Sequence, residues 1–311
     1  MDRLRLTGIL PPVPTPFDEK GNADLDGLAH NIHKLSATGL AGYVVMGSNG
    51  EAVHLSARER AAVIETARLA ADRGPARVVI AGVNELSTWA AIEGTRTAAG
   101  GGADAALVIT PYFYKNAMSQ AALANHFLAV ADASPIPILI YNVPANTGVI
   151  IEPETIASLS RHENIIGVKD SAGNMAAISA TVAATPGDFA VLCGNAGIFY
   201  PALVMGAAGA VLAVACIAPA ACVELFKAAA SGNHARAREL QTKIAPVSQI
   251  ITAGLGVPGL KAALELAGYK GGYPRAPLQP VGEAEVLRIK KFMQESGLFP
   301  ALQSSMVGAH D

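Results

Sequence analysis

Short apolar runs alternate with amphipathic segments along most of the chain. Most of the runs are rich in valine, isoleucine and leucine without interruption, as expected of strands that are buried on both faces. Strands that alternate with helices in this way predict βα units around a parallel sheet. We expect eight strands, at residues 8–13, 42–46, 77–81, 105–110, 136–141, 165–169, 189–193 and 209–214.

The segments between these runs have the periodicity of helices. Residues 56–73 begin with Ser56 and Glu59 at the spacing of a capping box. Eight βα units in roughly 215 residues fit an α/β fold of the (β/α)8 TIM barrel type better than an open doubly wound sheet. Three helical segments without strands follow, so we expect a barrel domain at 1–217 and a C-terminal helical extension at 218–311. These segments are 219–230, 235–254 and 258–267.

Composition excludes several classes of protein. The 311 residues are 51% hydrophobic, which supports a large core and excludes intrinsic disorder. A net charge of -2 provides no basic field for nucleic acid. Apolar runs stop well short of the ~20 residues that cross a bilayer, and no signal-peptide pattern is present, so we expect a cytoplasmic protein without membrane contact. Cys193, Cys216 and Cys222 lack metal-ligand spacing and resemble core residues.

Lys169 ends the sixth predicted strand, and the C-terminal ends of barrel strands carry the chemistry in this fold. Alternation places Lys169 on the same face as Ile165 and Gly167, which is the inside if that face lines the barrel. An apolar barrel mouth disfavours a charged ammonium, and a neutral amine can attack a carbonyl to form an imine. The alternative is a lysine that reaches solvent or pairs with Asp170.

Two further strand ends carry candidate groups. Tyr141 ends the fifth strand, next to the sixth, so its hydroxyl can exchange protons with the Lys169 amine; the alternative is a packed core tyrosine. After the second strand, GSNGE at 47–51 offers consecutive N–H groups at Ser48 and Asn49 that suit a small carboxylate or phosphate.

The spacing of Ser48 and Glu51 also fits a capping box, although the next helix has its own cap at Ser56. Gly194 and Asn195 follow the seventh strand, where they supply a polar contact or only a turn.

Other patterns lack the context that their chemistry needs. GLGVPG at 254–259 satisfies the dinucleotide-binding spacing but follows a helical segment instead of a strand. The histidines are scattered, so a metal-dependent aldolase would lack ligands. A phosphate-binding barrel needs a glycine-rich loop after the last strands, whereas 206–209 precedes the eighth.

Three stretches together carry a family resemblance: GSNGE at 47–51, YNVPANTG at 141–148 and GVKDS at 167–171. They resemble the dihydrodipicolinate synthase and N-acetylneuraminate lyase superfamily of pyruvate-dependent class I aldolases. The similarity extends from PTPF at 14–17 to GVPGLK at 256–261. It implies a barrel with a helical extension, assembled as a homotetramer (a dimer of dimers).

The resemblance also implies roles for individual residues. The substrate pyruvate would form a covalent imine on Lys169, so that no cofactor or metal is needed. Tyr141 would handle protons, and Ser48 and Asn49 would hold the pyruvate carboxylate. The other candidate substrate contacts are Ser171, Asn146, Gly194, Val211 and Tyr112.

Within the superfamily, SPIP at 134–137 and VPANTG at 143–148 are most similar to 4-hydroxy-2-oxoglutarate aldolase. The resemblance then implies cleavage of 4-hydroxy-2-oxoglutarate, or a related 4-hydroxy-2-oxo acid, to pyruvate and glyoxylate or another aldehyde. The alternative is 4-hydroxy-tetrahydrodipicolinate synthase, which condenses pyruvate with aspartate semialdehyde. In that pattern an arginine aligns with Asn146, and a neutral amide does not replace a bidentate guanidinium.

A second departure concerns the interface tyrosine of the family, which aligns with Phe113. Tyr112, Tyr114 or water would then complete the proton relay. A different class of function is a non-catalytic pyruvate-binding or regulatory barrel in which this relay has decayed.

Overall fold

Eight parallel strands form one sheet in the computed structural model, which describes residues 4–74, 77–299 and 302. From β2 to β8 each strand pairs with the next in sequence, and β8 pairs with β1. The strands are β1 (Gly8–Ile9), β2 (Gly42–Val45), β3 (Val78–Val83), β4 (Ala105–Ile109), β5 (Ile138–Asn142), β6 (Ile165–Asp170), β7 (Ala190–Cys193) and β8 (Gly209–Ala210).

The sheet closes on itself between β1 and β2. The Ala41 amide donates to the Ile9 carbonyl at 3.0 Å, and the Val13 amide donates to the Val44 carbonyl at 2.8 Å. A parallel bridge joins Pro12 to Val44 between these bonds. The predicted (β/α)8 TIM barrel is therefore confirmed, and the open sheet is excluded.

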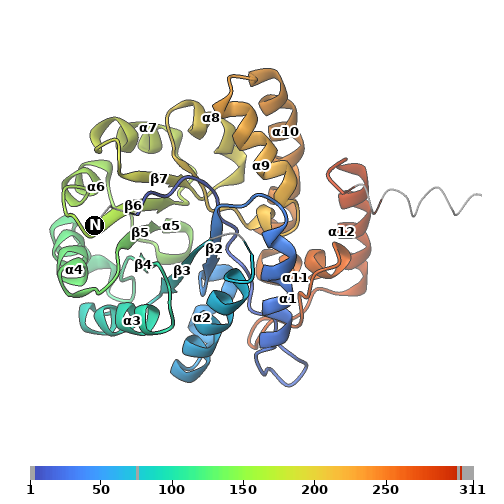
Figure 1. Ribbon diagram of the computed structural model, residues 1–311, viewed down its shortest axis with the longest axis horizontal. Coiled ribbons are helices and arrows are strands. Elements are labelled where there is room, and N and C mark those ends of the chain that lie inside the picture. The colour runs from blue at the N-terminus through green and yellow to red at the C-terminus, as the bar shows by residue number, and fades with distance from the viewer. Residues whose placement is uncertain (1–3, 75–76, 300–301, 303–311) are drawn as a thin grey trace, which may run out of the picture.

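Helices surround the strands as an outer ring (Figure 1). The capping box predicted for the second helix is present, because the Ser56 hydroxyl accepts from the Glu59 amide and the Glu59 carboxylate accepts from the Ser56 amide. The barrel helices are α1 (Leu25–Ser36), α2 (Ala57–Ala71), α3 (Thr88–Gly100), α4 (Gln120–Ala133), α5 (Pro144–Thr147), α6 (Pro153–Leu159), α7 (Met175–Ala184) and α8 (Phe199–Val204).

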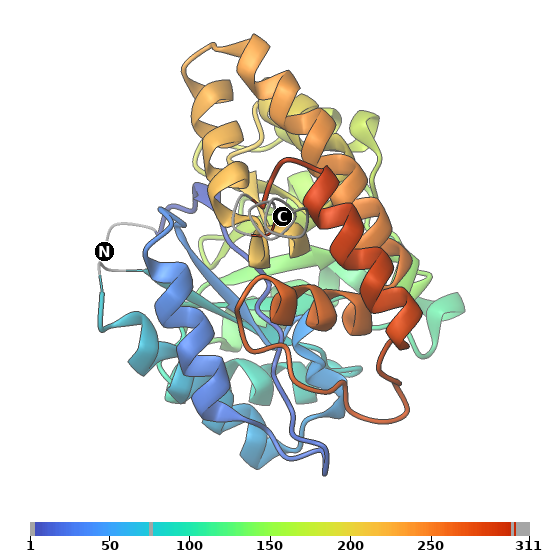
Figure 2. The same ribbon diagram turned by 90° about the vertical axis from the view of Figure 1, so that its right-hand side faces the viewer.

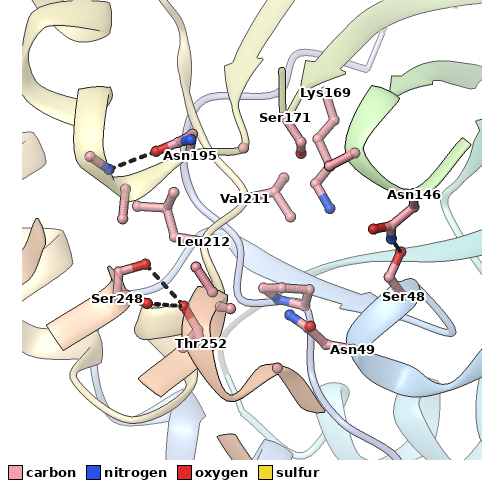
Figure 3. Close-up of a pocket in the computed structure, with 18 of the residues that line it drawn as sticks. Ser48, Asn49, Asn146, Lys169, Ser171, Asn195, Val211, Leu212, Ser248 and Thr252 are labelled. Carbon is pink, nitrogen blue, oxygen red and sulfur yellow. Dashed lines mark hydrogen bonds between the residues drawn. The ribbon is translucent and has the colours of Figure 1, made fainter. Parts of the chain in front are cut away.

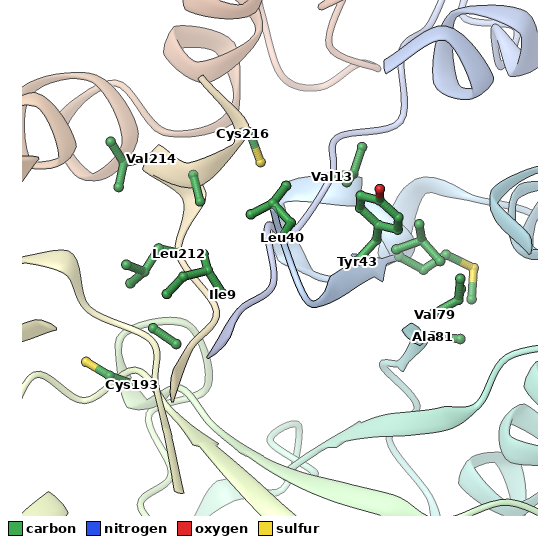
Figure 4. Close-up of a cluster of buried hydrophobic side chains, with 14 of the residues drawn as sticks. Ile9, Val13, Leu40, Tyr43, Val79, Ala81, Cys193, Leu212, Val214 and Cys216 are labelled. Carbon is green, nitrogen blue, oxygen red and sulfur yellow. The ribbon is translucent and has the colours of Figure 1, made fainter. Parts of the chain in front are cut away.

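Two apolar layers lie on the two faces of the strands. Leu10, Ile80, Leu107, Leu139 and Leu192 belong to a cluster of strand side chains that fills the barrel interior. Their neighbours in sequence belong to the larger layer between strands and helices, part of which is seen in Figure 4. All three cysteines are buried with free thiols, as predicted for core residues.

The predicted facing of the sixth strand is correct for Lys169 but wrong for Ile165. Ile165 packs in the outer layer, whereas Lys169 pairs in register with inward-facing Tyr141. The register shifts between the pairs of Ile138 and Leu139, where β6 has the extra residue Ile166. A shift of one residue reverses the facing of the residues beyond it.

The described part of the C-terminal region contains five further helical segments beside the barrel (Figure 2). These are α9 (Pro219–Ala230), α10 (His234–Val247), the π-helix Ser248–Gly254 and α11 (Gly256–Leu266), followed by α12 (Glu283–Glu295). The single helix predicted at 235–254 is wrong in its second part, since the chain changes to π geometry soon after Pro246, which has no N–H to donate.

Helix α12, which packs against α11, was not among the helices expected from the sequence. The sequence does contain a signal for this helix, because Val286, Ile289 and Met293 have helical spacing. Ile289 and Met293 are buried. In the described part of the chain, no helix has the length and apolar content needed to cross a membrane. The end of the predicted 218–311 extension, beyond residue 302, lies outside the described residues.

Candidate active site

A cavity of about 490 Å³ opens at the C-terminal ends of the barrel strands (Figure 3). Tyr112 lines an adjacent cavity of about 220 Å³, whose walls also include Ser48 and Asn146. The other predicted site residues line the main cavity: Ser48, Asn49, Tyr141, Asn146, Lys169, Ser171, Gly194 and Val211. Residues at the ends of strands or in the loops after them, from five different strands, are thus brought together.

Lys169 is buried, with 4% of its surface exposed, and its side chain points into the cavity. Its Nζ lies 4.1 Å from the centre of the Tyr141 ring. The alternative role as a partner of Asp170 is not what the structure shows, because no ion pair joins the two among the described residues. The Asp170 carboxylate instead accepts from Asn142 Nδ2 at 2.7 Å and from the Ala172 amide at 2.9 Å.

The Tyr141 hydroxyl lies between groups that can share its proton. It is 3.3 Å from Ser48 Oγ, and it also interacts with Lys169 and Ser171. Burial acts to raise the pKa of Tyr141, but the Lys169 ammonium and these hydrogen bonds outweigh it and lower the pKa below its usual value. A phenol with a lowered pKa beside an amine is suited to exchange protons with it.

The loop after β2 holds Ser48 and Asn49 between two strained residues. Met46 and Glu51 have φ values of 54° and 53°, in the left-handed region that non-glycine residues rarely adopt. Ser48 to Gly50 forms one turn of 3-10 helix, and the first amides of a helix have no acceptor within it. These amides are the donors that the sequence analysis assigned to a carboxylate.

The Glu51 side chain does not cap this turn, so the alternative capping box with Ser48 is wrong. Glu51 Oε1 instead pairs with Lys261 Nζ at 2.6 Å, and both side chains are about 1% exposed. Glu51 Oε2 accepts from the Arg275 amide at 2.9 Å and lies 3.1 Å from His54 Nδ1.

Lys261 continues this buried network into the C-terminal region. Its Nζ donates to the Tyr273 carbonyl at 2.7 Å and lies 4.5 Å from the centre of the Phe17 ring. Burial lowers the pKa of Lys261, and the interaction with Glu51 opposes that shift. The loop after β2 is thus anchored to helix α11.

Gly194 contributes space and not a side chain. A Cβ at this position would lie 2.0 Å from Ser171 Oγ, and the Gly194 amide donates to the Asp170 carbonyl at 2.6 Å. Ser171 can therefore approach the seventh strand closely. Across the cavity, Asn146 Nδ2 donates to Ser48 Oγ at 3.4 Å.

One wall of the cavity was missed by the sequence analysis. It comes from the end of α10, the π-helix and the start of α11, and its members are Ala245, Ser248, Gln249, Thr252, Ala253, Gly256 and Val257. These residues lie far along the chain from the strand ends, where the chemistry of a barrel is expected. Pro246 within a helical stretch was the available signal, because it marks an irregular helix and π segments often lie at functional sites.

The structure also shows where the other sequence features considered above lie. Residues 254–259 join the π-helix to α11 without a preceding strand, so they are not a dinucleotide loop. Phe113 and Tyr114 are largely exposed, at 70% and 74%, and line neither cavity. Among the described residues, no group of three or more His, Cys, Asp or Glu side chains could hold a metal ion.

Comparisons with known proteins agree with this architecture. A model of the dihydrodipicolinate synthetase family matches residues 5–296. A 4-hydroxy-tetrahydrodipicolinate synthase from Methanothrix thermoacetophila is 38% identical over 284 residues, covering 91% of this chain and 94% of the relative. Another from an Exiguobacterium species is 35% identical and covers 93% and 97%.

Solved structures similar to this chain belong to the same family. A dihydrodipicolinate synthase from Bacillus anthracis superposes with a TM-score of 0.88 at 31% identity, covering 93% of this chain and 97% of that one. YagE, an Escherichia coli K12 prophage protein of the dihydrodipicolinic acid synthase family, was solved in complex with pyruvate. It has a TM-score of 0.88 at 32% identity and covers 94% and 99%.

Proposed function

The chain belongs to the dihydrodipicolinate synthetase family, and we propose that it is a pyruvate-dependent class I aldolase whose imine forms on Lys169. The observation that carries this proposal is the position of Lys169 Nζ, which is buried at the cavity beside the Tyr141 ring. Pyruvate as the substrate is supported by YagE, which was solved with pyruvate bound.

In the proposed reaction, the free amine of Lys169 attacks the C2 ketone of pyruvate. The carbinolamine loses water to give the imine, and the Tyr141 hydroxyl carries protons to the departing oxygen and from the attacking nitrogen. Loss of a C3 proton gives an enamine, whose C3 attacks the aldehyde carbon while the aldehyde oxygen takes up a proton. Water then hydrolyses the imine and releases the 4-hydroxy-2-oxo acid. Cleavage is the same sequence in reverse.

We assign the pyruvate carboxylate to the loop after β2. Ser48 and Asn49 line the cavity and begin the 3-10 turn, so their amides have no acceptor within that turn and remain available to a carboxylate. Ser48 Oγ also contacts the Tyr141 hydroxyl, which links carboxylate binding to proton transfer.

The comparisons and the sequence resemblance each favour a different aldehyde as the second substrate. Aspartate semialdehyde is favoured by the relatives, because those at 38% and 35% identity are named 4-hydroxy-tetrahydrodipicolinate synthase. Glyoxylate is favoured only by the sequence resemblance to 4-hydroxy-2-oxoglutarate aldolase, so the comparisons support the synthase alternative better.

The first experiment measures turnover with wild type and Lys169→Ala. Pyruvate consumption with aspartate semialdehyde is compared with pyruvate release from 4-hydroxy-2-oxoglutarate. We expect turnover by the wild type and loss of at least a thousandfold in the variant, with an unchanged circular dichroism spectrum. Retained turnover in the folded variant would exclude Lys169 as the nucleophile.

A non-catalytic pyruvate-binding barrel is distinguished by the same pair of proteins. Such a barrel would bind pyruvate without turnover in either direction, and binding would survive in Lys169→Ala. Isothermal titration with pyruvate provides this comparison.

A further inference from the structure

We propose that four residues that do not line the main cavity are positioning residues for pyruvate: Thr15, Asn84, Glu51 and Lys261. They hold the loop after β2 in a strained conformation that keeps the first amides of its 3-10 turn directed to the substrate carboxylate. This inference rests on the proposed imine chemistry and extends it to residues on which the affinity for pyruvate depends.

The loop after β2 is strained at both of its ends. Among the described residues, Met46 and Glu51 are the non-glycine residues with positive φ, and they flank the turn from Ser48 to Gly50. Such conformations persist only where the surrounding structure holds them. A change of φ at either end would reorient the amides between them. The contacts that hold the two ends therefore decide where the amides point.

The first end of the loop is held from β3 and the residue that follows it. Asn84 Nδ2 donates to the Met46 carbonyl at 2.8 Å. The same carbonyl lies against the strand, where a Cβ on Gly82 would come within 2.0 Å of its oxygen, so only glycine leaves room for the contact. Because a peptide group is planar, these contacts fix the orientation of the peptide immediately before the turn.

The second end is held by the C-terminal region and by the segment after β1. Glu51 Oε1 pairs with Lys261 Nζ at 2.6 Å, and Glu51 Oε2 accepts from the Arg275 amide at 2.9 Å. Thr15 Oγ1 donates to the Gly50 carbonyl at 2.8 Å. Thr15, Glu51 and Lys261 are at most 2% exposed, so water cannot replace a partner that is lost.

A positioning role has a signature that a catalytic role does not share. Lys169 and Tyr141 are held by β6 and β5, which pair in register, and not by the loop. Weaker positioning of the amides should therefore raise the pyruvate concentration that half-saturates the protein, while the amount of imine at saturation stays the same. Less imine at saturation with an unchanged half-saturating concentration would place these residues in the chemistry and overturn the inference.

The test measures trapping by a low concentration of cyanoborohydride at a series of pyruvate concentrations. Because reduction is slow under these conditions, the rate of adduct formation reports the fraction of the protein that is present as the imine. Absence of an adduct in the wild type would overturn the proposed imine chemistry and this inference with it. With an adduct in the wild type, the variants test the positioning of the loop alone.

Substitutions of Thr15 separate its hydrogen bond from its packing. Thr15→Val keeps the volume and loses the bond to Gly50, whereas Thr15→Ser keeps the bond and loses a methyl group. We expect half-saturating pyruvate to rise about tenfold in Thr15→Val and to change less than about twofold in Thr15→Ser. Equal effects in the two variants, or a larger effect in Thr15→Ser, would overturn the inference.

Asn84 is tested against another asparagine that donates to the backbone. Asn84→Ala should also raise half-saturating pyruvate about tenfold, because it frees the Met46 carbonyl. Asn164→Ala is the matched control, since Asn164 Nδ2 donates to two backbone carbonyls at the opposite end of the barrel, at 2.8 and 3.1 Å. No rise in Asn84→Ala, or an equal rise in Asn164→Ala, would overturn the inference.

The buried pair is tested without leaving a single charge behind. Glu51→Gln/Lys261→Met removes the carboxylate and the ammonium together, and it should raise half-saturating pyruvate about tenfold. Asn31→Ala is its control, because Asn31 is a buried residue of α1 that holds the Lys270 backbone of the same C-terminal region. No rise in the double variant, or an equal rise in Asn31→Ala, would contradict a positioning role for the pair.

Discussion

At the scale of single residues, the proposed chemistry depends on the ends of two neighbouring strands. Lys169 and Tyr141 are paired in register on β6 and β5, which fixes the amine over the phenol ring without help from any loop. Rigid strands hold reacting groups more closely than loops do. The hydroxyl of Tyr141 then reaches Ser48, so one residue joins the proposed nucleophile Lys169 to the loop after β2.

Replacement of Tyr141 by Phe should slow imine formation without preventing it. The ring beneath Lys169 Nζ would remain, but the proton carrier would be lost, and general acid–base groups contribute about 10²–10⁴-fold. We expect time-resolved borohydride trapping to show adduct formation at least a hundredfold slower.

Tyr43→Phe is the control for this change, because Tyr43 is a buried tyrosine whose hydroxyl contacts Ser36 away from the cavity. Trapping at the wild-type rate in Tyr141→Phe would show that water or another group carries the proton.

At the scale of elements, the loop after β2 is held by the C-terminal region. The buried pair of Glu51 and Lys261 joins this loop to α11, and Arg275 adds a backbone donor to the same carboxylate. The π-helix between α10 and α11 forms a cavity wall. The C-terminal helices therefore complete the site as well as covering the barrel.

Removal of one partner of this buried pair should destabilise the protein strongly. Glu51→Gln would leave the Lys261 ammonium buried without its carboxylate, and breaking such pairs costs about 3–5 kcal/mol. Urea unfolding of the variant measures the loss. The double variant Glu51→Gln/Lys261→Met removes both charges and should recover part of it. The single variant Lys261→Met completes the cycle, and a double variant whose loss relative to wild type equals the sum of the two single losses would contradict the coupling.

The repeated βα units could be predicted from the sequence, whereas the irregular parts of the fold, a register shift and a π-helix, could not. The strands and the position of Lys169 follow from apolar runs and from the rule that barrel chemistry lies at strand ends. The outward facing of Ile165 could not be predicted, because a register shift depends on the partner strand. Ser248 and Thr252 were missed because their approach to the cavity depends on how the C-terminal helices pack, which local periodicity does not encode.

At the scale of the whole molecule, a second link joins the N-terminal half to the end of the chain. The Arg275 guanidinium pairs with Glu59 of α2 and donates to the carbonyls of Gly21 and His54. Hydrogen bonds from Arg275 outweigh burial and lower the pKa of Glu59 to about 2. Segments more than two hundred residues apart are thus held together by ionised groups.

This link should make stability sensitive to acid. The folded-state pKa of Glu59 is depressed, so its contribution is fully present above the ordinary pKa of glutamate and is lost as the pH falls toward 2. We expect the free energy of unfolding to fall less between pH 5 and pH 3 in Glu59→Gln than in wild type, as measured by urea titration. Glutamine is also suited to the N3 position of the capping box, so this variant preserves the start of α2. Equal losses in both proteins would show that Glu59 contributes nothing to the acid dependence.

The central claim is that pyruvate becomes covalently attached to Lys169. The most direct measurement is borohydride reduction in the presence of pyruvate, followed by proteolysis and mass spectrometry of the peptide that contains residues 165–171. We predict a stable pyruvyl modification located on Lys169, absent without pyruvate and absent from Lys169→Ala. A modification on another lysine, or an unmodified Lys169 at saturating pyruvate, would contradict the account.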